Sequence, residues 1–455
     1  MKRATALGFR STAFAIAGII VGLSAISPLP AEAQVPGNNA VYSSNAIVPS
    51  SAFIDASVFI GNGPNQRGNI CDAIYGILSG TLSYQYPATG AVIDARGISG
   101  SPALTCPAGT MLWNGTAVPP AFVLLPAGTI IINSTWVLPS NTHLIGEGDG
   151  IPSSSTPATT IQAGSSFPDS MIEFGSSSTC PSVGSIAVCT GISVENLTLD
   201  GLGHSMNGIT NGFSQNTSYV NHVTLYRIHG VGLLLEGTTS GGANNSGPYS
   251  NITCDVGFTP PSTAACAQIF NPNGGTHGIH GLTCTLEGTG TSPSPAILLD
   301  SSNNSIENVS IKGFTDGIRI GKNGNAQSNV LVNINGNTVS GENVVHIFST
   351  LGKTITDLSI MGVSNVGGGT TIQDDLTVTS LQDPSVALYA LGEKSNGGYS
   401  RFTTSPNAAT WGSGTSAPGS CSSSASGSLY SNSAGGANGV FFVCPAGGGL
   451  WKPIL

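Results

Sequence analysis

The stretch from Val123 to Gly150 reads VLLPAGTIIINSTWVLPSNTHLIGEGDG and decides the fold. Short apolar runs alternate in it with groups of Pro, Gly, Ser, Asn and Asp, the residues that favour turns. These interruptions come too often for a helix, so the stretch predicts short strands joined by tight turns. We expect the strands to cover residues 123–125, 129–132, 136–138 and 143–145.

A four-residue pattern of the form Asn-apolar-Thr-apolar recurs along the chain after this stretch. With substitutions at its first and third positions, it begins at Asn196, His222, Asn251, Gly281, Asn308, Asn329 and Asp357. Successive occurrences are 26, 29, 30, 27, 21 and 28 residues apart. One such unit cannot bury its apolar side alone, so the repeat predicts stacked coils that share one core, a parallel β-solenoid.

Alternation along a strand sets which side chains of each coil face this core. In the first occurrence we expect Leu197 and Leu199 to point inward and Asn196, Thr198 and Asp200 to point outward. The segment from Asn69 to Ser79 is different, because Ile70, Ile74, Ile77 and Leu78 fall on one helical face. We expect it to be the one good amphipathic helix of the mature chain.

Several of these features together resemble a known family. The segment VFIGNG at Val58, the helix around Asp72, the opening stretch and the coils look like the right-handed β-helix proteins of the pectate-lyase superfamily (the pectate lyase 3-like type). The resemblance covers roughly Phe53 to Thr379, and it departs from the family at Gly61-Asn62-Gly63, where an Asp is usual. It implies an all-β, right-handed parallel β-helix with an N-terminal capping helix. For activity it implies a lyase, a glycoside hydrolase, an epimerase or a viral tailspike.

The N-terminus carries the features of an export signal. Lys2, Arg3 and Arg10 precede the apolar run 13–26, and Ala31-Glu32-Ala33 has the A-x-A form of a cleavage site. Residues 1–33 are therefore predicted to be a secretory signal peptide cleaved near Ala33, because the apolar run is too short for a membrane anchor. We expect a secreted, periplasmic or cell-surface protein with no membrane span.

Composition and charge narrow the classes of partner. Only 8% of residues are charged and the mean hydropathy is +0.18, which argues against disorder. Removing residues 1–33 takes the basic residues from 13 to 10 and the acidic residues from 22 to 21, so the net charge changes from −9 to −11. A chain this poor in cations offers no footprint for nucleic acid, nor for an anionic membrane surface.

Nine cysteines follow the predicted cleavage site, and an exported protein tends to oxidise them. Their spacing suggests the pairs Cys71–Cys106, Cys180–Cys189 and Cys421–Cys444, with Cys254 joined to either Cys266 or Cys284. Because nine is an odd number, one cysteine must remain without a partner within the chain. No set of Cys and His has the spacing of a zinc site, so we interpret the cysteines as structural.

The predicted organisation has four parts. Residues 1–33 are the signal peptide, 34–52 a polar lead-in, 53–380 the β-helix, and 381–455 a linker with a small C-terminal β-hairpin module around Cys421 and Cys444. This last module is rich in Gly and Ser and carries aromatic strands. We expect it to cap the solenoid or to make the protein an oligomer.

The residues that follow each repeat pattern form the first candidate site. They should align in an outward column of Asp200, Tyr226, Asp255, Thr285, Lys312, Asn333 and Met361. Asp200 and Asp255 lie two coils apart, so their backbones are expected ~9.6 Å from each other. Two carboxylates at such a separation suit inverting glycoside hydrolysis. Tyr226 and His229 would complete the catalytic set and Arg227 would bind substrate, although Asp is also common as a turn former at strand ends.

A second candidate site lies on the other strand of each coil. Leu298, Arg319 and His346 should form a column, with Asp300 and Asp316 close by and Lys322 near Arg319. Arg319 and Lys322 could bind the carboxylate of a uronic acid, since Arg makes bidentate pairs with carboxylates. Asp300 would belong to the same substrate-binding set. The alternative is a surface ion pair between Arg319 and Asp300.

Two activities of the resembling family receive less support. The segment from Asp316 to Lys322 is similar to the Arg-Ile-Lys segment of polygalacturonases, but no Asn-Thr-Asp triplet accompanies it. A calcium-dependent lyase would need six to eight oxygen ligands, and no carboxylate cluster in the sequence is dense enough to assign them. We therefore assign no metal ligands and keep Ca²⁺ as a cofactor only for the case of a lyase.

The leading hypothesis is a secreted enzyme, lyase or glycoside hydrolase, that degrades a polysaccharide in a groove on the β-helix. The competing hypothesis is a non-catalytic adhesin or tailspike-like protein that binds a cell-surface glycan.

Overall fold

A computed structural model describes the chain from Phe53 to Ile454 with gaps. The described residues are 53–82, 90–110, 112–113, 121–150, 158–165, 169–183, 186–237, 245–258, 260–270, 275–287, 292–338, 341–348, 353, 355–356, 358–375, 388–391, 411–414, 416, 418–421, 429–432, 441–445 and 448–454. The predicted signal peptide and lead-in lie outside them, as does the predicted boundary at residue 380.

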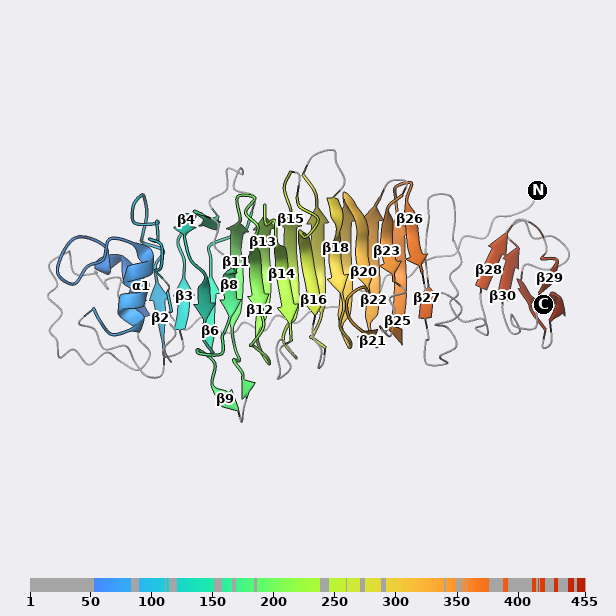
Figure 1. Ribbon diagram of the computed structural model, residues 1–455, viewed down its shortest axis with the longest axis horizontal. Coiled ribbons are helices and arrows are strands. Elements are labelled where there is room, and N and C mark those ends of the chain that lie inside the picture. The colour runs from blue at the N-terminus through green and yellow to red at the C-terminus, as the bar shows by residue number, and fades with distance from the viewer. Residues whose placement is uncertain are drawn as a thin grey trace, which may run out of the picture. The chain divides into compact units, whose positions relative to one another are not determined.

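Most strand residues of the described chain belong to two long parallel sheets (Figure 1). The first sheet contains β1 (Phe53–Asp55), β2 (Ala91–Asp94), β3 (Ala121–Leu124), β6 (Thr142–Ile145), β11 (Ser193–Asp200), β13 (Tyr219–Tyr226), β15 (Tyr249–Asp255), β17 (Ile279–Thr285), β19 (Ser305–Lys312), β22 (Val330–Asn337), β25 (Leu358–Asn365) and β27 (Leu388–Leu391), with β4 (Gly128–Ile132) and β7 (Thr159–Ala163) attached beside β11. The second sheet contains β5 (Trp136–Leu138), β8 (Ser170–Phe174), β12 (Asn207–Asn211), β14 (Val231–Glu236), β16 (Ala265–Phe270), β18 (Ser292–Leu299), β20 (Phe314–Ile320), β23 (Asn343–Ile347) and β26 (Thr370–Asp374).

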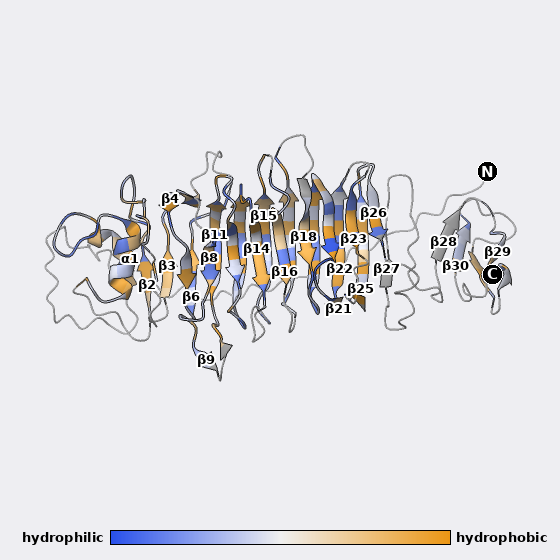
Figure 2. Ribbon diagram, in the orientation of Figure 1, coloured by the Kyte–Doolittle hydropathy of each residue, from blue (hydrophilic) through white to orange (hydrophobic). Residues whose placement is uncertain are grey.

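The chain alternates between these sheets, so each coil contributes one strand to each. β13 pairs with β15 in the first sheet while β14, which lies between them in sequence, pairs with β16 in the second. Figure 2 shows apolar and polar residues alternating along the strands, and the apolar set forms one continuous buried core. The predicted all-β, right-handed parallel β-helix is confirmed.

The first residue of the repeat pattern bends each long strand of the first sheet. Asn196, His222, Asn251, Gly281, Asn308, Asn333 and Gly362 all have a left-handed φ between 51° and 72°. Asn and Gly tolerate this conformation better than other residues, which explains why the pattern begins with them. Two coils carry an additional amide contact here, since Asn333 Nδ2 donates to Asn308 Oδ1 at 2.8 Å.

The last two repeats are shifted from their predicted positions. In the register of β19 and β22, Val309 pairs with Ile334, so the sixth pattern begins at Asn333 and not at Asn329. The seventh begins at Gly362, because Ile334 pairs with Val363. The corrected spacings are 26, 29, 30, 27, 25 and 29 residues. Asn329 is buried instead, where its Nδ2 donates to the carbonyl of Ser301 at 2.8 Å.

The predicted helix is α1 (Ile70–Leu78), the one α-helix among the described residues. Asn69 caps it, accepting a hydrogen bond from the amide of Asp72, and its apolar face enters the solenoid core. A short 3₁₀ helix, η1 (Ala56–Phe59), precedes it, and Cys71–Cys106 ties it to a loop before β3. The capping helix is therefore confirmed.

The opening stretch folds as predicted into β3, β4, β5 and β6. Its turns are held by side chains, because Glu147 accepts a hydrogen bond from the amide of Ala127 at 2.8 Å and Thr159 donates to the carbonyl of Pro126 at 2.9 Å. These contacts join turns that are far apart in sequence, which fixes the first coils to one another.

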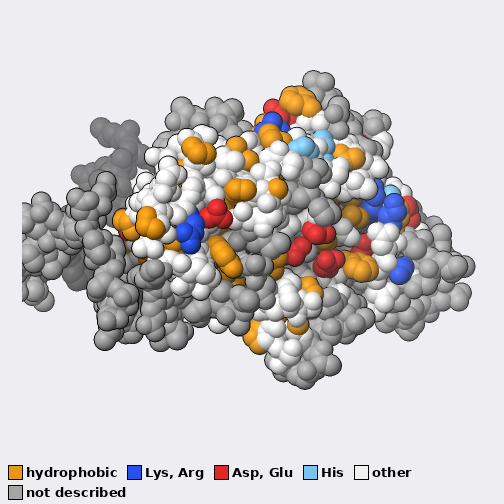
Figure 3. Space-filling view, turned by 60° about the vertical axis from the view of Figure 1, so that its left-hand side comes forward, with side chains coloured by type: hydrophobic (Ala, Val, Ile, Leu, Met, Phe, Trp, Pro, Cys, Tyr) orange, Lys and Arg blue, Asp and Glu red, His pale blue; other side chains and the backbone are white. Residues whose placement is uncertain are grey.

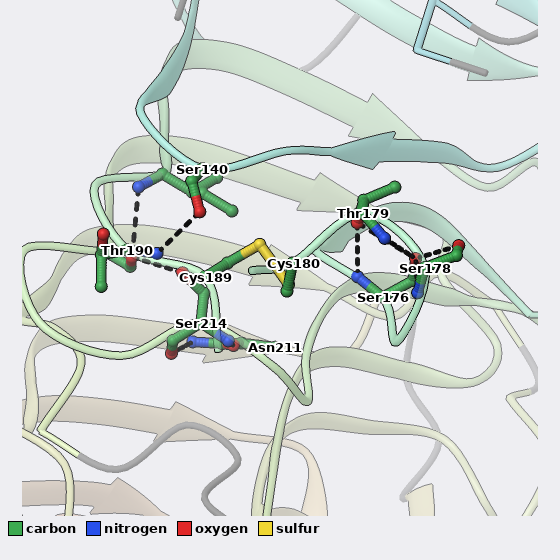
Figure 4. The surroundings of a disulfide bond; sticks show 11 residues. Ser140, Ser176, Ser178, Thr179, Cys180, Cys189, Thr190, Asn211 and Ser214 are labelled. Atoms are coloured by element: carbon green, nitrogen blue, oxygen red, sulfur yellow. Dashed lines mark hydrogen bonds between the residues drawn. A yellow bond between two sulfur atoms is a disulfide. The ribbon is translucent and has the colours of Figure 1, made fainter. Parts of the chain in front are cut away.

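The disulfides agree with the spacing argument. Besides Cys71–Cys106, they are Cys180–Cys189, Cys254–Cys266 and Cys421–Cys444, and Cys284 is free and buried. Figure 4 shows Cys180–Cys189 closing a loop whose flanks carry side-chain hydrogen bonds, among them Ser140 Oγ accepting from the amide of Thr190. That loop also holds the small strands β9 (Ser182–Val183) and β10 (Ile186–Ala187).

The remaining strands are short. β21 (Ala326–Gln327) pairs with β24 (Ile355–Thr356) beside the coils. The C-terminal module has a four-stranded sheet of β28 (Trp411–Gly414), β30 (Leu429–Asn432), β31 (Phe441–Val443) and β33 (Lys452–Ile454), and a pair of β29 (Ser420–Cys421) and β32 (Gly449–Leu450). In the part of the chain that the structure describes, no helix is long and apolar enough to cross a membrane.

Candidate functional site

The first predicted column exists as far as Lys312. Asp200, Tyr226, Asp255, Thr285 and Lys312 are paired in register on adjacent strands of the first sheet. Beyond Lys312 the prediction was wrong, because Asn337 takes the place expected for Asn333, and Met361 pairs with Val332 in another column. The shifted register of the last two repeats accounts for both errors.

Asp200 is fully buried and its carboxylate is occupied, although we expected it to point outward as an acid or base. Arg227 Nε donates to Oδ1 at 3.0 Å, while Oδ2 accepts from a terminal nitrogen of Arg227 and from Gln162 Nε2. The amide of Leu202 also donates to Oδ1 at 3.0 Å. The carboxylate therefore fixes a turn and an arginine, and has no access to a substrate.

Asp255 is also buried and closes the equivalent turn two coils later. Its Oδ1 accepts a hydrogen bond from the amide of Gly257 at 2.9 Å. Both carboxylates thus have the role of turn formers that strand-end aspartates often have. Their geometry therefore does not support an inverting pair of carboxylates.

The other members of the first site lie at the same edge of the first sheet. Arg227 stacks over the ring of Tyr226, 4.7 Å from its centroid, and the Tyr226 hydroxyl donates to Glu287 at 3.4 Å. Burial raises the pKa of Tyr226, and the Glu287 carboxylate adds to this effect. Burial lowers the pKa of His229, with a further decrease from the nearby His204. Tyr226, Arg227 and Glu287 contact one another, but Arg227 is paired with the buried Asp200, so the catalytic carboxylates expected beside it are not available to a substrate.

The second predicted column is confirmed in full. Leu298 on β18, Arg319 on β20 and His346 on β23 are paired in register on the outer face of the second sheet. Gln373 on β26 continues the column. This side of the β-helix therefore brings together a guanidinium, an imidazole and a carboxamide from successive coils.

Six residues form what we call the His346 cluster: Asp316, Arg319, Lys322, His346, Phe348 and Asp375. Nδ1 of His346 lies 2.8 Å from Asp316 Oδ1, and its Nε2 lies 2.7 Å from Asp375 Oδ2. Arg319 Nε donates to Asp316 Oδ2 at 2.8 Å, and Asn343 Nδ2 donates to Oδ1 at 2.8 Å. The cluster thus has a buried carboxylate at its base and a histidine that joins it to a carboxylate at the surface.

The pKa values in this cluster follow from these contacts. Burial alone would raise the pKa of Asp316, but hydrogen bonds from His346, Asn343 and Arg319 outweigh it and lower that pKa to about 2. Burial likewise opposes protonation of His346, yet the Asp316 and Asp375 carboxylates raise its pKa above the ordinary value. The imidazole is therefore biased toward its cationic form, and both carboxylates toward their ionised forms.

Phe348 gathers the three cations around one ring. The His346 ring stacks on it with centroids 3.9 Å apart, and the Arg319 guanidinium and the Lys322 ammonium each lie 5.4 Å from its centroid. Cation–π attraction favours this placement. Lys322 remains exposed, so its charge faces solvent at the edge of the cluster.

Asp300 does not join this cluster, although we expected it to bind substrate or to pair with Arg319. Its carboxylate is buried and accepts hydrogen bonds from the amide and the carboxamide of Asn323, at 3.0 and 3.2 Å. The ion pair of Arg319 is made with Asp316 instead. Asp300 is therefore one more residue that shapes a turn.

Sequence reasoning missed two members of the cluster, Phe348 and Asp375, and did not assign roles to His346 and Asp316. Phe348 could have been predicted from the sequence, because it lies two residues after His346 and therefore faces the same side. Asp375 could not have been predicted, because its place beside His346 depends on the register between β23 and β26. The contact between Glu287 and Tyr226 was missed for the same reason as Asp375, because it joins residues from different coils.

The opposite half of this face is acidic. Glu173 on β8 lies in the column that leads to Arg319, and Glu236 ends β14. Burial raises the pKa of both carboxyls, and Asp169 and Glu236 raise that of Glu173 further. Figure 3 shows acidic side chains gathered near the middle of the face it presents, while Lys, Arg and His side chains stand in separate groups toward its edges.

A serine, a histidine and a glutamate also meet on the first sheet, but not as a catalytic triad. His143 Nδ1 lies 2.8 Å from Ser193 Oγ, and Ser193 donates to Glu195 at 2.8 Å. In a triad the acid orients the histidine, whereas here Glu195 accepts from Ser193 and from the Tyr219 hydroxyl. No activated nucleophile results.

No group of three or more His, Cys, Asp or Glu is placed to hold a metal ion among the residues that the structure describes. In the His346 cluster the carboxylate oxygens already accept hydrogen bonds from Arg319, Asn343 and Gln373 or face His346. These oxygen atoms therefore do not fit a calcium ion, which takes six to eight oxygen ligands.

No protein-family model and no curated protein sequence matches this chain. Among solved structures, the A-module of the mannuronan C-5 epimerase AlgE4 of Azotobacter vinelandii is 13% identical, with a TM-score of 0.37 over 76% of this chain and 95% of its own. Tailspike protein 3 of bacteriophage CBA120 is 10% identical, with a TM-score of 0.28 over 88% and 68%. PfbA, a surface adhesin of Streptococcus pneumoniae, is 11% identical, with a TM-score of 0.22 over 89% and 98%. Because these TM-scores are low, the fold is assigned from the strand pairing of this chain itself.

Proposed function

We propose that this chain binds an anionic, uronate-containing polysaccharide on the outer face of the second sheet, at the His346 cluster. The observation that carries the proposal is the placement of Arg319, Lys322 and His346 around one aromatic ring. Three cationic groups at one place are conspicuous in a chain whose 455 residues include only 13 Lys and Arg and whose net charge is −9.

The chemistry of the cluster suits a sugar acid. Lys322 supplies an exposed ammonium, and the Phe348 ring supplies an apolar surface beside it. Arg319 is held by Asp316 through Nε and one terminal nitrogen, which fixes the direction of the guanidinium. A carboxylate approaching Lys322 and His346 meets charges that are already in place, so little side-chain entropy is lost on binding.

The architecture suits a polymer. A β-helix presents the same face on every coil, ~4.8 Å apart, so a chain of repeated sugars can lie across several coils. The acidic half of the face, with Glu173 and Glu236, would repel such a polymer, because like charges disfavour association. We therefore place the bound segment on the coils from β18 to β26.

Isothermal titration with polygalacturonate, alginate and neutral dextran tests this proposal. We expect the two polyuronates to bind, dextran not to bind, and affinity to fall as salt is added. Lys322→Gln should weaken binding at least threefold. Lys312→Gln is the matched control, because Lys312 is exposed on the first sheet in the same coil and loses the same charge. Equal losses in the two variants, or equal binding of dextran, would refute the location or the class of ligand.

Cleavage of the same polymer, as a lyase or a glycoside hydrolase, is the second candidate function. The observation that favours it is His346, a group biased toward its protonated form next to two cations that can neutralise a sugar carboxylate. Unsaturated products from polygalacturonate or alginate would identify a lyase, and new reducing ends without unsaturation a hydrolase. If neither forms while the polymer binds, the non-catalytic alternative, an adhesin or tailspike-like surface protein, is the function.

An exported location fits either candidate. Four disulfides are typical of an oxidising compartment, where polysaccharides of cell surfaces are accessible. Oligomer formation through the C-terminal module stays a prediction, and sedimentation of the protein with and without residues 381–455 tests it.

A further inference from the structure

We infer that Asp375 occupies the position against His346 that a sugar carboxylate takes when the polymer binds, so that it competes with the ligand from within the protein. This inference rests on the proposed function and identifies the atom that the ligand contacts, Nε2 of His346. It also assigns Asp375 a role in setting affinity.

The two carboxylates on His346 are held very differently. Asp316 is 3% exposed and has contacts to His346, to Asn343 and to two nitrogens of Arg319. Asp375 is 39% exposed, and its side chain has one contact to His346 and one to Gln373. Asp316 is therefore a fixed part of the structure, whereas the carboxylate of Asp375 can be displaced.

The number of N–H donors on the His346 ring also distinguishes Asp316 from Asp375. His346 presents both ring nitrogens to carboxylates, and only the cationic ring has two N–H donors. The charged groups around it are Asp316, Asp375, Arg319 and Lys322, the last of which also contacts the Phe348 ring. When the ring loses a proton, one contact loses its donor. Asp316 keeps Arg319 and Asn343 as partners in that case, whereas Asp375 keeps only Gln373.

Displacement of Asp375 does not require the coil to open. Asp375 directly follows β26, and its backbone amide donates to the carbonyl of Ile347 at 3.0 Å. Rotation of its side chain alone would uncover Nε2 of His346 while this backbone contact persists. A ligand carboxylate in its place would restore the ion pair with His346, in a cluster that also holds Lys322 and Arg319.

Asp375→Asn tests the inference, because it keeps the size of the side chain and removes its charge. With His346 protonated, the cluster then has three positive charges and one negative charge in place of three and two. We expect polygalacturonate to bind about three- to fivefold more tightly, the effect of one exposed charge pair. Glu307→Gln, on the first sheet, removes the same charge from another face and should leave affinity unchanged.

A second measurement detects the contact between His346 and Asp375 directly and does not depend on affinity. In an NMR titration of the His346 ring nitrogens, Asp375→Asn should lower the pKa of His346, and saturating trigalacturonate should raise it again. Binding by Asp375→Asn that equals or is weaker than wild type, or no recovery of the His346 pKa, would overturn the inference while the proposed function stands. If wild-type protein binds no polyuronate at all, the proposed function fails first and the inference fails with it.

Discussion

The guanidinium of Arg227 and the carboxylate of Asp200 form a two-point contact across adjacent coils, with Nε 3.0 Å from Oδ1 and a terminal nitrogen on Oδ2. Asp200 is fully buried while Arg227 is one-third exposed. A buried charge requires a partner, and this pair supplies it. Asp200 is consequently a structural residue, and the candidate site lies on the other sheet, at the His346 cluster.

Asp200→Asn should therefore reduce stability by about 1–3 kcal/mol, the range for hydrogen bonds to charged groups. Guanidinium denaturation of wild type and variant measures the change. Asp255→Asn is the control, because an asparagine Oδ1 can accept the same hydrogen bond from the amide of Gly257. A loss for Asp255→Asn that equals the loss for Asp200→Asn would contradict this account of the two turns.

The left-handed residues of the first sheet give a second prediction. Asn333→Ala should cost about 1–2 kcal/mol, because it places alanine at a φ of 55° and removes the hydrogen bond to Asn308. Asn333→Gly should cost less, since glycine adopts this conformation without strain. Thermal unfolding of both variants compares them. Equal losses would mean that the side-chain contact, and not the backbone conformation, selects asparagine here.

Cys284 should be unreactive in the folded protein. It is buried without a disulfide partner, and burial raises the pKa of its thiol far above the ordinary value. A thiol reagent should detect no free thiol in the native protein and one per chain after denaturation without reductant. A fast-reacting thiol in the native state would contradict the burial.

The protonation of His346 should make stability depend on pH. Its folded pKa is raised, so its contribution is fully present below the unfolded value of about 6.5 and is lost as pH rises through the folded pKa. The thermal midpoint of wild type should exceed that of His346→Gln most at pH ~6, and the difference should shrink at higher pH. A difference that grows with pH would show that the ring is not held as a cation.

The fold could be predicted from the sequence because its causes are local and repeated. The Pro and Gly turns of residues 123–150 and the Asn or Gly at each bend act within a few residues, and a sequence displays them directly. The two shifted repeats show the limit of this reasoning. Near Asn329 and near Asn333 the composition is similar, and only pairing with β19 distinguishes them.

The candidate site could be predicted only in part, for a related reason. The column of Leu298, Arg319 and His346 follows from strand alternation, and it was found. The partners of each side chain depend on turns between strands, which place Arg227 on Asp200 and Asn323 on Asp300. The sequence thus predicted which charged residues lie in one column. It did not predict which of them are paired with another side chain.

A crystal structure of the protein with a bound oligo-uronate tests the central claim most directly. The account predicts a sugar carboxylate between Lys322 and Nε2 of His346, with the side chain of Asp375 turned away and the rest of the sugar chain across the coils of the second sheet. An oligosaccharide bound along the first sheet, or a His346 cluster that stays closed around Asp375 at saturating ligand, would contradict it.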